Sequence, residues 1–331
     1  MTHPATVHRH IVPGFILLGA IWGASFLFIK VSVRELHPLY VTLGRVALGA
    51  VTLLTVMLIL RDRLPREPRL WGHLAVIGVV GLVLPYTLFG YGEQRIPSLL
   101  AGIWNATTPL VALPLAALLF RTERFSLRRT LGIVLGFLGV LVVLGVWQGV
   151  DGAALTGQLM CFGAAAAYGI AIPYTKRFVS HQPISSLAAI TAQMLIATAL
   201  LLLVAPLVAG APPAVTSLPA DVLGSMLLLG AFGTGLAFLI HYRNIRLVGA
   251  SSAAQVTYLI PLFAVLVGIT VLAEPLTWYQ PVGAIVVLAG VAISQGSLPR
   301  WRRRQATPAT DAPPSTGAPP PTTAADPLAT H

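Results

Sequence analysis

The sequence predicts an all-α integral membrane protein with ten transmembrane helices, arranged as two inverted five-helix repeats. Three observations carry this prediction. Of the 331 residues, 56% are hydrophobic and only 9% are charged, whereas a soluble domain carries about 25% charged residues. Apolar runs long enough to cross a bilayer recur along the chain, and the two halves of the sequence resemble each other. Most of the surface must therefore face lipid.

Each predicted span is an apolar run that could cross the bilayer as a helix. A hydrocarbon core about 30 Å thick needs about 20 such residues, and proline or glycine lies between most of the runs. The predicted spans are 11–33, 38–60, 70–92, 96–120, 129–147, 154–176, 184–209, 221–241, 249–273 and 277–297.

Basic residues predict the orientation of the spans. Seventeen of the 21 Lys and Arg fall in the two termini and the loops of one side, and two fall in the loops of the other side. Cytoplasmic loops carry the excess of positive charge, so both termini are expected in the cytoplasm and the protein in the cell inner (plasma) membrane. The domains expected are a cytoplasmic N-terminus over 1–10, a first repeat over 11–147, a second repeat over 153–297, and a tail over 300–331. The tail is rich in Arg, Pro, Ala and Thr, a composition typical of disorder.

An internal repeat relates the two halves. Trp22-Gly23 precedes Lys30 as Tyr168-Gly169 precedes Lys176, with eight residues from the aromatic residue to the lysine in both cases. Near the end of each half, a glutamate (Glu123 or Glu274) precedes a glycine by nine residues. Each half has five predicted spans, an odd number, so the second half must insert upside down. Inverted repeats are characteristic of secondary transporters.

These motifs are similar to those of the EamA-type branch of the drug/metabolite transporter superfamily. The resemblance covers about residues 11–296 and implies ten helices with a substrate pathway between the halves. It also implies transport of amino acids, other metabolites or drugs. The turn at Glu123 departs from the usual small-Gly-Glu pattern. The segments that carry the resemblance are WGASFLFIK and ATTPL in the first half, and YGIAIPYTKR, TYLIPL and AEPLTWYQPVGAIVVLAG in the second.

Polar and aromatic residues inside the spans are the candidates for a substrate pathway, since ligand sites are mostly apolar with a few placed polar groups. Arg45 is the sharpest of them, because an arginine inside a membrane needs a partner or a wet cavity. Asn105 and Gln255 are the preferred pair, each shortly before a proline. Packing or hydrogen bonding between helices is the alternative for each residue. The candidates are Trp22, Ser25, Arg45, Tyr86, Trp104, Asn105, Thr108, Tyr168, Gln193, Gln255 and Tyr258.

Three charged residues near span ends are candidates for coupling or gating. Lys30 and Lys176 repeat in the two halves, and Lys30 could also snorkel toward the membrane surface. Glu93 could carry a coupling proton or pair with Arg95 or Arg45, the alternative being a solvated loop charge.

The sequence favours a gradient-driven exporter of amino acids or other small metabolites that works by alternating access, coupled to protons or to exchange. The alternatives are a drug or lipid flippase, or a membrane enzyme acting on lipid intermediates. Enzymatic activity, metal sites and cofactors are not expected, because phosphate-loop, nucleophile-elbow and zinc-protease motifs are missing. The expected partners are a small-molecule substrate and membrane lipids, with a homodimer as a further option, and no nucleic acid.

Overall fold

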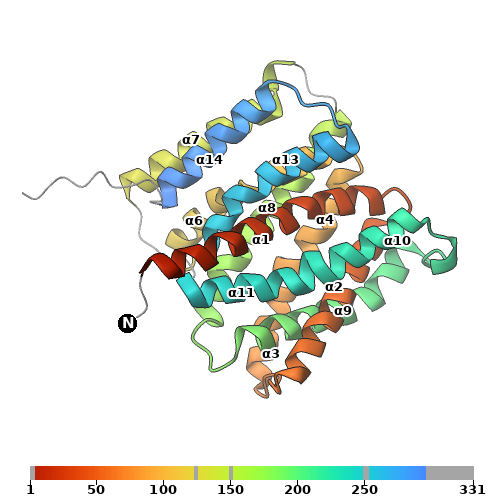
Figure 1. Cartoon of the computed structure of the whole chain (residues 1–331). Helices are drawn as coiled ribbons and strands as arrows, with labels where there is room; N and C mark the ends of the chain where they lie inside the picture. The colour runs from red at the N-terminus through yellow and green to blue at the C-terminus, as the bar shows by residue number, and fades with distance from the viewer. Residues whose placement is uncertain (1–3, 123–125, 149–151, 249–252, 296–331) are drawn as a thin grey trace, which may run out of the picture. The chain divides into compact units, whose positions relative to one another are not determined.

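A computed structural model describes residues 4–122, 126–148, 152–248 and 253–295, which fold as helices joined by short connections. The predicted tail and Glu123 lie outside these residues. Figure 1 labels the longer helices. In the first half the elements are α1 (Pro4–Ser32), α2 (Pro38–Ile59), α3 (Pro68–Gly78), η1 (Val79–Val83), α4 (Leu84–Glu93), α5 (Ser98–Asn105), α6 (Thr108–Leu118), α7 (Leu127–Leu144) and η2 (Val146–Gln148). In the second half they are α8 (Gly152–Phe178), α9 (Ser186–Ala209), η3 (Val215–Ser217), α10 (Ala220–Leu227), η4 (Leu228–Leu236), α11 (Ala237–Val248), η5 (Ala254–Tyr258), α13 (Leu259–Leu272) and α14 (Tyr279–Gln295).

Nine helical segments within the described residues are long and apolar enough to cross a membrane. They correspond to the first nine predicted spans. The tenth predicted span is α14, an apolar helix of 17 residues (Tyr279–Gln295). The all-helical membrane architecture is therefore confirmed, whereas the count of ten spans stays a prediction.

The helices α2 and α9 run antiparallel along their whole length. At one end, the Tyr40 hydroxyl near the start of α2 donates a hydrogen bond to the carbonyl of Gly210, which follows α9. At the other end, the Ser185 hydroxyl, just before α9, donates to the carboxylate of Asp62, just after α2. These are the second helices of the two halves, so their pairing is the contact expected between inverted repeats.

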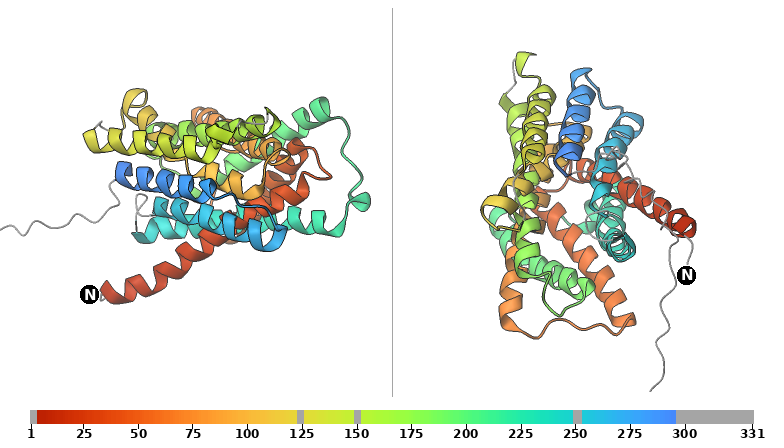
Figure 2. Two further views of the ribbon diagram at one scale, coloured as in Figure 1. Left: turned by 90° about the horizontal axis from the view of Figure 1, so that it is seen from above. Right: turned by 90° about the vertical axis from the view of Figure 1, so that its left-hand side faces the viewer.

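The helices α7 and α14 form a second antiparallel pair, and they lie side by side in Figure 1. Glycines bring their backbones into contact. A Cβ on Gly290 would lie 2.4 Å from the backbone nitrogen of Gly136, and one on Gly283 would lie 2.6 Å from that of Val143. Small residues allow such close approach in membranes. Figure 2 shows the same two helices adjacent from two further directions.

Two membrane-length segments contain a wide, π-helical turn, and the turns lie at matching positions of the two halves. The first is η1, between α3 and α4, and the second is η4, between α10 and α11. Leu82 in η1 precedes Gly139 by 57 residues, and Gly233 in η4 precedes Gly290 by the same 57. In a π-helical turn the carbonyl of one residue bonds to the N–H five residues later instead of four, and such turns occur frequently at functional sites.

The segments that contain α5–α6 and η5–α13 are also irregular at matching places. The first is interrupted after Asn105, shortly before Pro109, and the second begins with a tight turn before Pro261. Proline cannot donate the helical hydrogen bond, so a carbonyl is freed in each half. In the first half, the hydroxyl of Thr108 donates to the carbonyl of Asn105 at 2.8 Å and satisfies it.

Candidate functional site

Arg45 is held between the two halves of the chain. Its side chain, on α2, is only 7% exposed. Nε donates a hydrogen bond of 3.0 Å to Oγ1 of Thr234 on η4, and Cζ lies 3.7 Å from the ring centroid of Tyr86 on α4. A buried arginine needs such partners, because its charge is costly away from water. The cation thus joins helices of both halves at one point.

The wide turn of η4 gives Thr234 its orientation. Its hydroxyl donates to the carbonyl of Leu229, five residues earlier, at 3.0 Å. A hydroxyl has one hydrogen to donate and lone pairs with which to accept. Because the hydrogen is used by Leu229, a lone pair faces Arg45. Thr234 is fully buried, so water does not compete for this arrangement.

A cluster of aromatic rings continues from Tyr86, the ring that lies against Arg45. The Tyr86 ring meets the ring of Tyr168 edge to face, with centroids 6.4 Å apart. Tyr168 lies 6.3 Å from Phe89, and Phe89 lies 5.3 Å from Phe26. These residues come from α1, α4 and α8. The faces of aromatic rings attract cations, so the cluster supports the charge of Arg45 without a carboxylate.

Two further candidates from α1 lie against the second half. Trp22 is half-buried, and its ring lies 6.1 Å from Phe238 and 5.2 Å from His241, both on α11. Ser25 is buried, and its hydroxyl donates to the carbonyl of Ile21 at 2.9 Å. A Cβ on Gly233 would lie 2.8 Å from the Ser25 hydroxyl. Ser25 is therefore engaged in helix packing.

The remaining pathway candidates are spread over the bundle. Trp104 is buried, and its Nε1 donates to Gln158 at 3.2 Å. Gln193 is buried on α9, where its backbone faces Gly78. Asn105 is half-buried, whereas Gln255 is exposed, and no described hydrogen bond joins this pair. The Tyr258 hydroxyl donates to Gln295. Of the pathway candidates, Arg45, Tyr86 and Tyr168 are the ones that gather around one charged centre.

A second polar group lies where α1 and α4 end. The Nζ of Lys30 donates to the backbone carbonyls of Glu93 and Ile96, the latter at 2.9 Å. Lysine at a helix C-terminus satisfies free carbonyls and complements the helix dipole. Lys30 is thus half-buried and bound rather than free to snorkel. Lys176, its counterpart, is exposed, and its Nζ lies 3.5 Å from the carbonyl oxygen of Thr122.

Glu274 caps a helix of the opposite half. Its carboxylate accepts hydrogen bonds from the backbone nitrogen and hydroxyl of Ser98, at 2.7 and 2.9 Å, and from the nitrogen of Leu99, at 3.0 Å. These groups form the first turn of α5. Unsatisfied N–H groups at a helix start favour a negative charge. Glu274 therefore has a structural role, because its hydrogen bonds join the two halves.

Two site residues escaped the sequence reasoning. Thr234 gives no signal in the sequence, because its role depends on the wide turn. Asn244 does give one: Tyr91-Gly92-Glu93 recurs as Tyr242-Arg243-Asn244, and Asn244 precedes Gly290 by 46 residues as Glu93 precedes Gly139. Asn244 is buried, and neither atom of its amide has a hydrogen-bond partner within the described chain.

Within the ranges that the structure describes, no three acidic, histidine or cysteine residues are gathered so that they could hold a metal ion.

Membrane-length helices in two related halves, with antiparallel contacts between equivalent helices and a buried cation at their junction, define a membrane transporter. The comparison with protein families agrees with this class and narrows it. The model of the EamA-like transporter family matches the chain twice, over residues 11–145 and 155–295. The chain belongs to this family, which is part of the drug/metabolite transporter superfamily.

Relatives of the chain are named as transporters or as an efflux pump. The chain is 30% identical over 277 residues to an uncharacterized transporter of Archaeoglobus fulgidus, covering 82% of this chain and 94% of the relative. It is 24% identical to a probable amino-acid metabolite efflux pump of Salmonella typhimurium, covering 84% of this chain and 92% of that protein. A solved crystal structure superposes with a TM-score of 0.61 at 18% identity, covering 86% of this chain and 97% of the solved chain. This likeness shows the fold alone.

Proposed function

We propose that the protein exports amino acids or related small metabolites that carry a carboxylate, by alternating access between its two halves. The single observation that carries the proposal is that Arg45 is buried between the halves with most of its N–H donors unused by the residues that the structure describes. A guanidinium has five N–H donors, and only Nε is hydrogen-bonded within the described chain, to Thr234. Both Nη nitrogens remain for a ligand, and a guanidinium binds a carboxylate through two parallel hydrogen bonds.

The position of Arg45 fits alternating access. A ligand on Arg45 would touch α2 of the first half, while the same side chain is bonded to η4 of the second half. Movement of one half against the other would then change the surroundings of the ligand. The relative from Salmonella typhimurium, named as a probable amino-acid metabolite efflux pump, supports amino acids as the first candidates.

The charge of Arg45 also discriminates between substrate classes. A buried cation repels cationic drugs and favours anionic groups. Lipids and cationic drugs therefore enter the experiment as competing substrates rather than as proposals.

The test is counterflow in proteoliposomes. Vesicles are loaded with one unlabelled compound from a panel of amino acids, organic acids, amines and lipids, and the uptake of its labelled form is followed. Carboxylate-bearing compounds should exchange, and Arg45→Ala should abolish the exchange at matched protein content. Arg69→Ala is the control, because Arg69 is exposed at the start of α3 and away from Arg45. Exchange of amines or lipids alone, or normal exchange by Arg45→Ala, would refute the proposal.

A further inference from the structure

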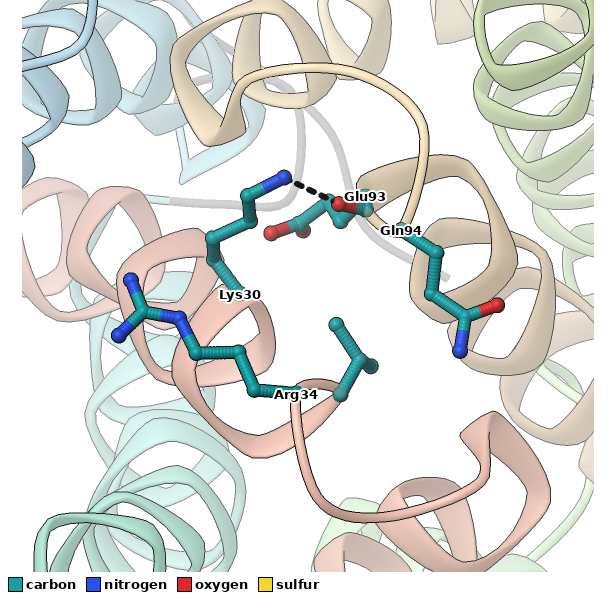
Figure 3. Close-up of a pocket in the computed structure, with 5 residues that line it drawn as sticks. Lys30, Arg34, Glu93 and Gln94 are labelled. Carbon is teal, nitrogen blue, oxygen red and sulfur yellow. Dashed lines mark hydrogen bonds between the residues drawn. The ribbon is translucent and has the colours of Figure 1, made fainter. Parts of the chain in front are cut away.

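Glu93 is a buried carboxylate that lacks the partners an ionised carboxylate requires. It is the last residue of α4, and its exposure is 0%. Neither carboxylate oxygen accepts a hydrogen bond within the described chain. The residue lines a pocket of about 210 Å³ together with Lys30, Val33, Arg34 and Gln94. In Figure 3 the side chains of Lys30 and Glu93 reach toward each other between α1 and α4.

The charged groups around Glu93 do not provide that partner. Lys30, on α1, spends two of its donors on the backbone carbonyls of Glu93 and Ile96. Glu274, which follows α13, is itself negative and is held by three donors of α5. Arg34, on the loop after α1, is exposed.

Two further titratable groups face Glu93 from the helices packed on α4. Arg45 on α2 donates from Nε to Thr234 and lies over the Tyr86 ring, and Cys161 on α8 is a buried thiol. Within the described chain, none of these groups donates a hydrogen bond to the Glu93 carboxylate.

Burial without hydrogen bonds has very different free-energy costs for the ionised and the neutral form of a carboxyl group. An ionised carboxylate in such a place loses its hydration and gains no donor, which is far more costly than the burial of a neutral acid. This conformation therefore suits the protonated acid. Release of the proton requires water or a donor at the carboxyl group, and hence a rearrangement where α1 and α4 end, at the wall of the pocket.

The second half carries a neutral amide at the matching position. Asn244 is as deeply buried as Glu93, at 1% exposure, and its amide is equally without partners. Packing in both halves thus accepts an uncharged polar group at this place. Only the first half can bind and release a proton there.

We propose that Glu93 is the proton-binding carboxylate that couples transport to a pH gradient. The inference rests on the carrier function proposed above and identifies its coupling ion. The carboxylate takes a proton from hydronium, leaving water, when the pocket is hydrated. The neutral acid is then enclosed during the conformational change, and the reverse transfer completes the cycle.

The test compares exchange with uphill transport in one preparation. Proteoliposomes hold equal substrate concentrations inside and outside, the membrane potential is clamped at zero with potassium and valinomycin, and a pH gradient of one unit is imposed. At one proton per substrate, wild type should build about a tenfold substrate gradient, since one pH unit and a tenfold concentration ratio represent the same free energy. Reversal of the pH gradient should reverse the direction.

The variant Glu93→Gln reproduces the neutral acid permanently. We expect it to keep counterflow but to build no substrate gradient at either sign of the pH gradient. Glu35→Gln is the matched control, because Glu35 is an exposed carboxylate just beyond the same end of α1, and it should behave as wild type.

The possible outcomes separate the two proposals. If wild type exchanges no carboxylate-bearing compound, the proposed function fails. If wild type exchanges substrate but ignores the pH gradient, or if Glu93→Gln still builds a gradient, Glu93 is not the coupling site. Loss of both exchange and uphill transport by Glu93→Gln, with normal yield and elution, would also overturn the inference, because it would mean that the carboxyl group is needed for the conformational change itself.

Discussion

The Nε of Arg45 donates a hydrogen bond of 3.0 Å to Oγ1 of Thr234, and this bond connects the first half of the chain to the second. It depends on the wide turn of η4, because the Thr234 hydroxyl can face Arg45 with a lone pair only while its hydrogen is used by Leu229. The bond fixes the plane of the guanidinium and with it the direction of both Nη nitrogens.

Replacement of Thr234 by valine should weaken transport without disrupting the bundle. Valine keeps the shape but leaves Nε without its acceptor, and a hydrogen bond to a charged group contributes about 1.5–3 kcal/mol. We expect Vmax/KM for a carboxylate-bearing substrate to fall about ten- to 150-fold in proteoliposomes. Thr234→Ser keeps the hydroxyl and should stay close to wild type. Equal rates for the valine and serine variants would contradict this role.

Tyr86 should act on Arg45 through its ring rather than its hydroxyl, because Cζ lies over the ring face at 3.7 Å. A cation–π contact contributes about 0.5–2 kcal/mol. Tyr86→Phe should therefore retain transport, and Tyr86→Leu should lower Vmax/KM by about two- to thirtyfold, as measured by uptake of labelled substrate. A larger loss in Tyr86→Phe than in Tyr86→Leu would assign the effect to the hydroxyl.

Loss of the Glu274 carboxylate should destabilise the contact between the two halves. The first turn of α5 would lose three hydrogen bonds, and loss of a helix cap costs about 0.5–2 kcal/mol. We expect Glu274→Ala to melt a few degrees lower than wild type in detergent. Glu274→Gln should melt at a temperature between those of wild type and Glu274→Ala. Glu67→Ala is the control, since Glu67 precedes α3 but makes no capping hydrogen bond through its side chain. Unchanged melting of Glu274→Ala would contradict the cap.

The pairing of α7 with α14 should not tolerate a methyl group at Gly290. The added Cβ would lie 2.4 Å from the nitrogen of Gly136 and 2.6 Å from the carbonyl oxygen of Gly132, and neither backbone atom can rotate away. We expect Gly290→Ala to lower the yield of monodisperse protein and its melting temperature. Gly224→Ala provides the comparison, because no atom lies within 4 Å of the added Cβ. Similar losses in both variants would point to helix propensity rather than packing.

Cysteine labelling can test the inverted topology and the predicted orientation together. Cys161 is the only cysteine of the sequence and is fully buried, so background labelling should be low. Arg66 and Thr216 are exposed after α2 and α9, which run antiparallel. An impermeant maleimide should label Thr216→Cys on intact cells and Arg66→Cys only in inside-out vesicles. Labelling of both from one side would refute the inverted arrangement.

The sequence predicted the helices well because composition and length decide them. The described part of each apolar run is largely helical, and serines cap α7 and α9, with Ser126 accepting from Arg129 and Ser185 from Ala188. The ends of the helices differ from the predicted span ends where a helix continues past the apolar run. For example, α11 extends to Val248, whereas the predicted span ends at residue 241.

The site was only partly predictable, because it depends on packing between distant segments. The charge of Arg45 was visible in the sequence, but its acceptor was not, since Thr234 follows from a wide turn that has no sequence signature. For Glu93 the sequence predicts either a coupling residue or a solvated loop charge, and it does not predict complete burial. Its burial results from the close approach of α4 to α8, where a Cβ on Gly92 would lie 2.4 Å from the sulfur of Cys161. The preferred pairing of Asn105 with Gln255 remains a prediction.

The matching wide turns of η1 and η4 also bear on the history of the protein. Each requires one additional residue in a helix, and insertion of a residue at the same place in two separate helices is two independent events. Inheritance needs only one such event, in an ancestor of half the length that existed before its gene was duplicated and fused. That ancestor would have worked as a pair of identical chains inserted in opposite directions. Arg45 in the first half and Thr234 in the second would then be differences that arose between the two copies after fusion.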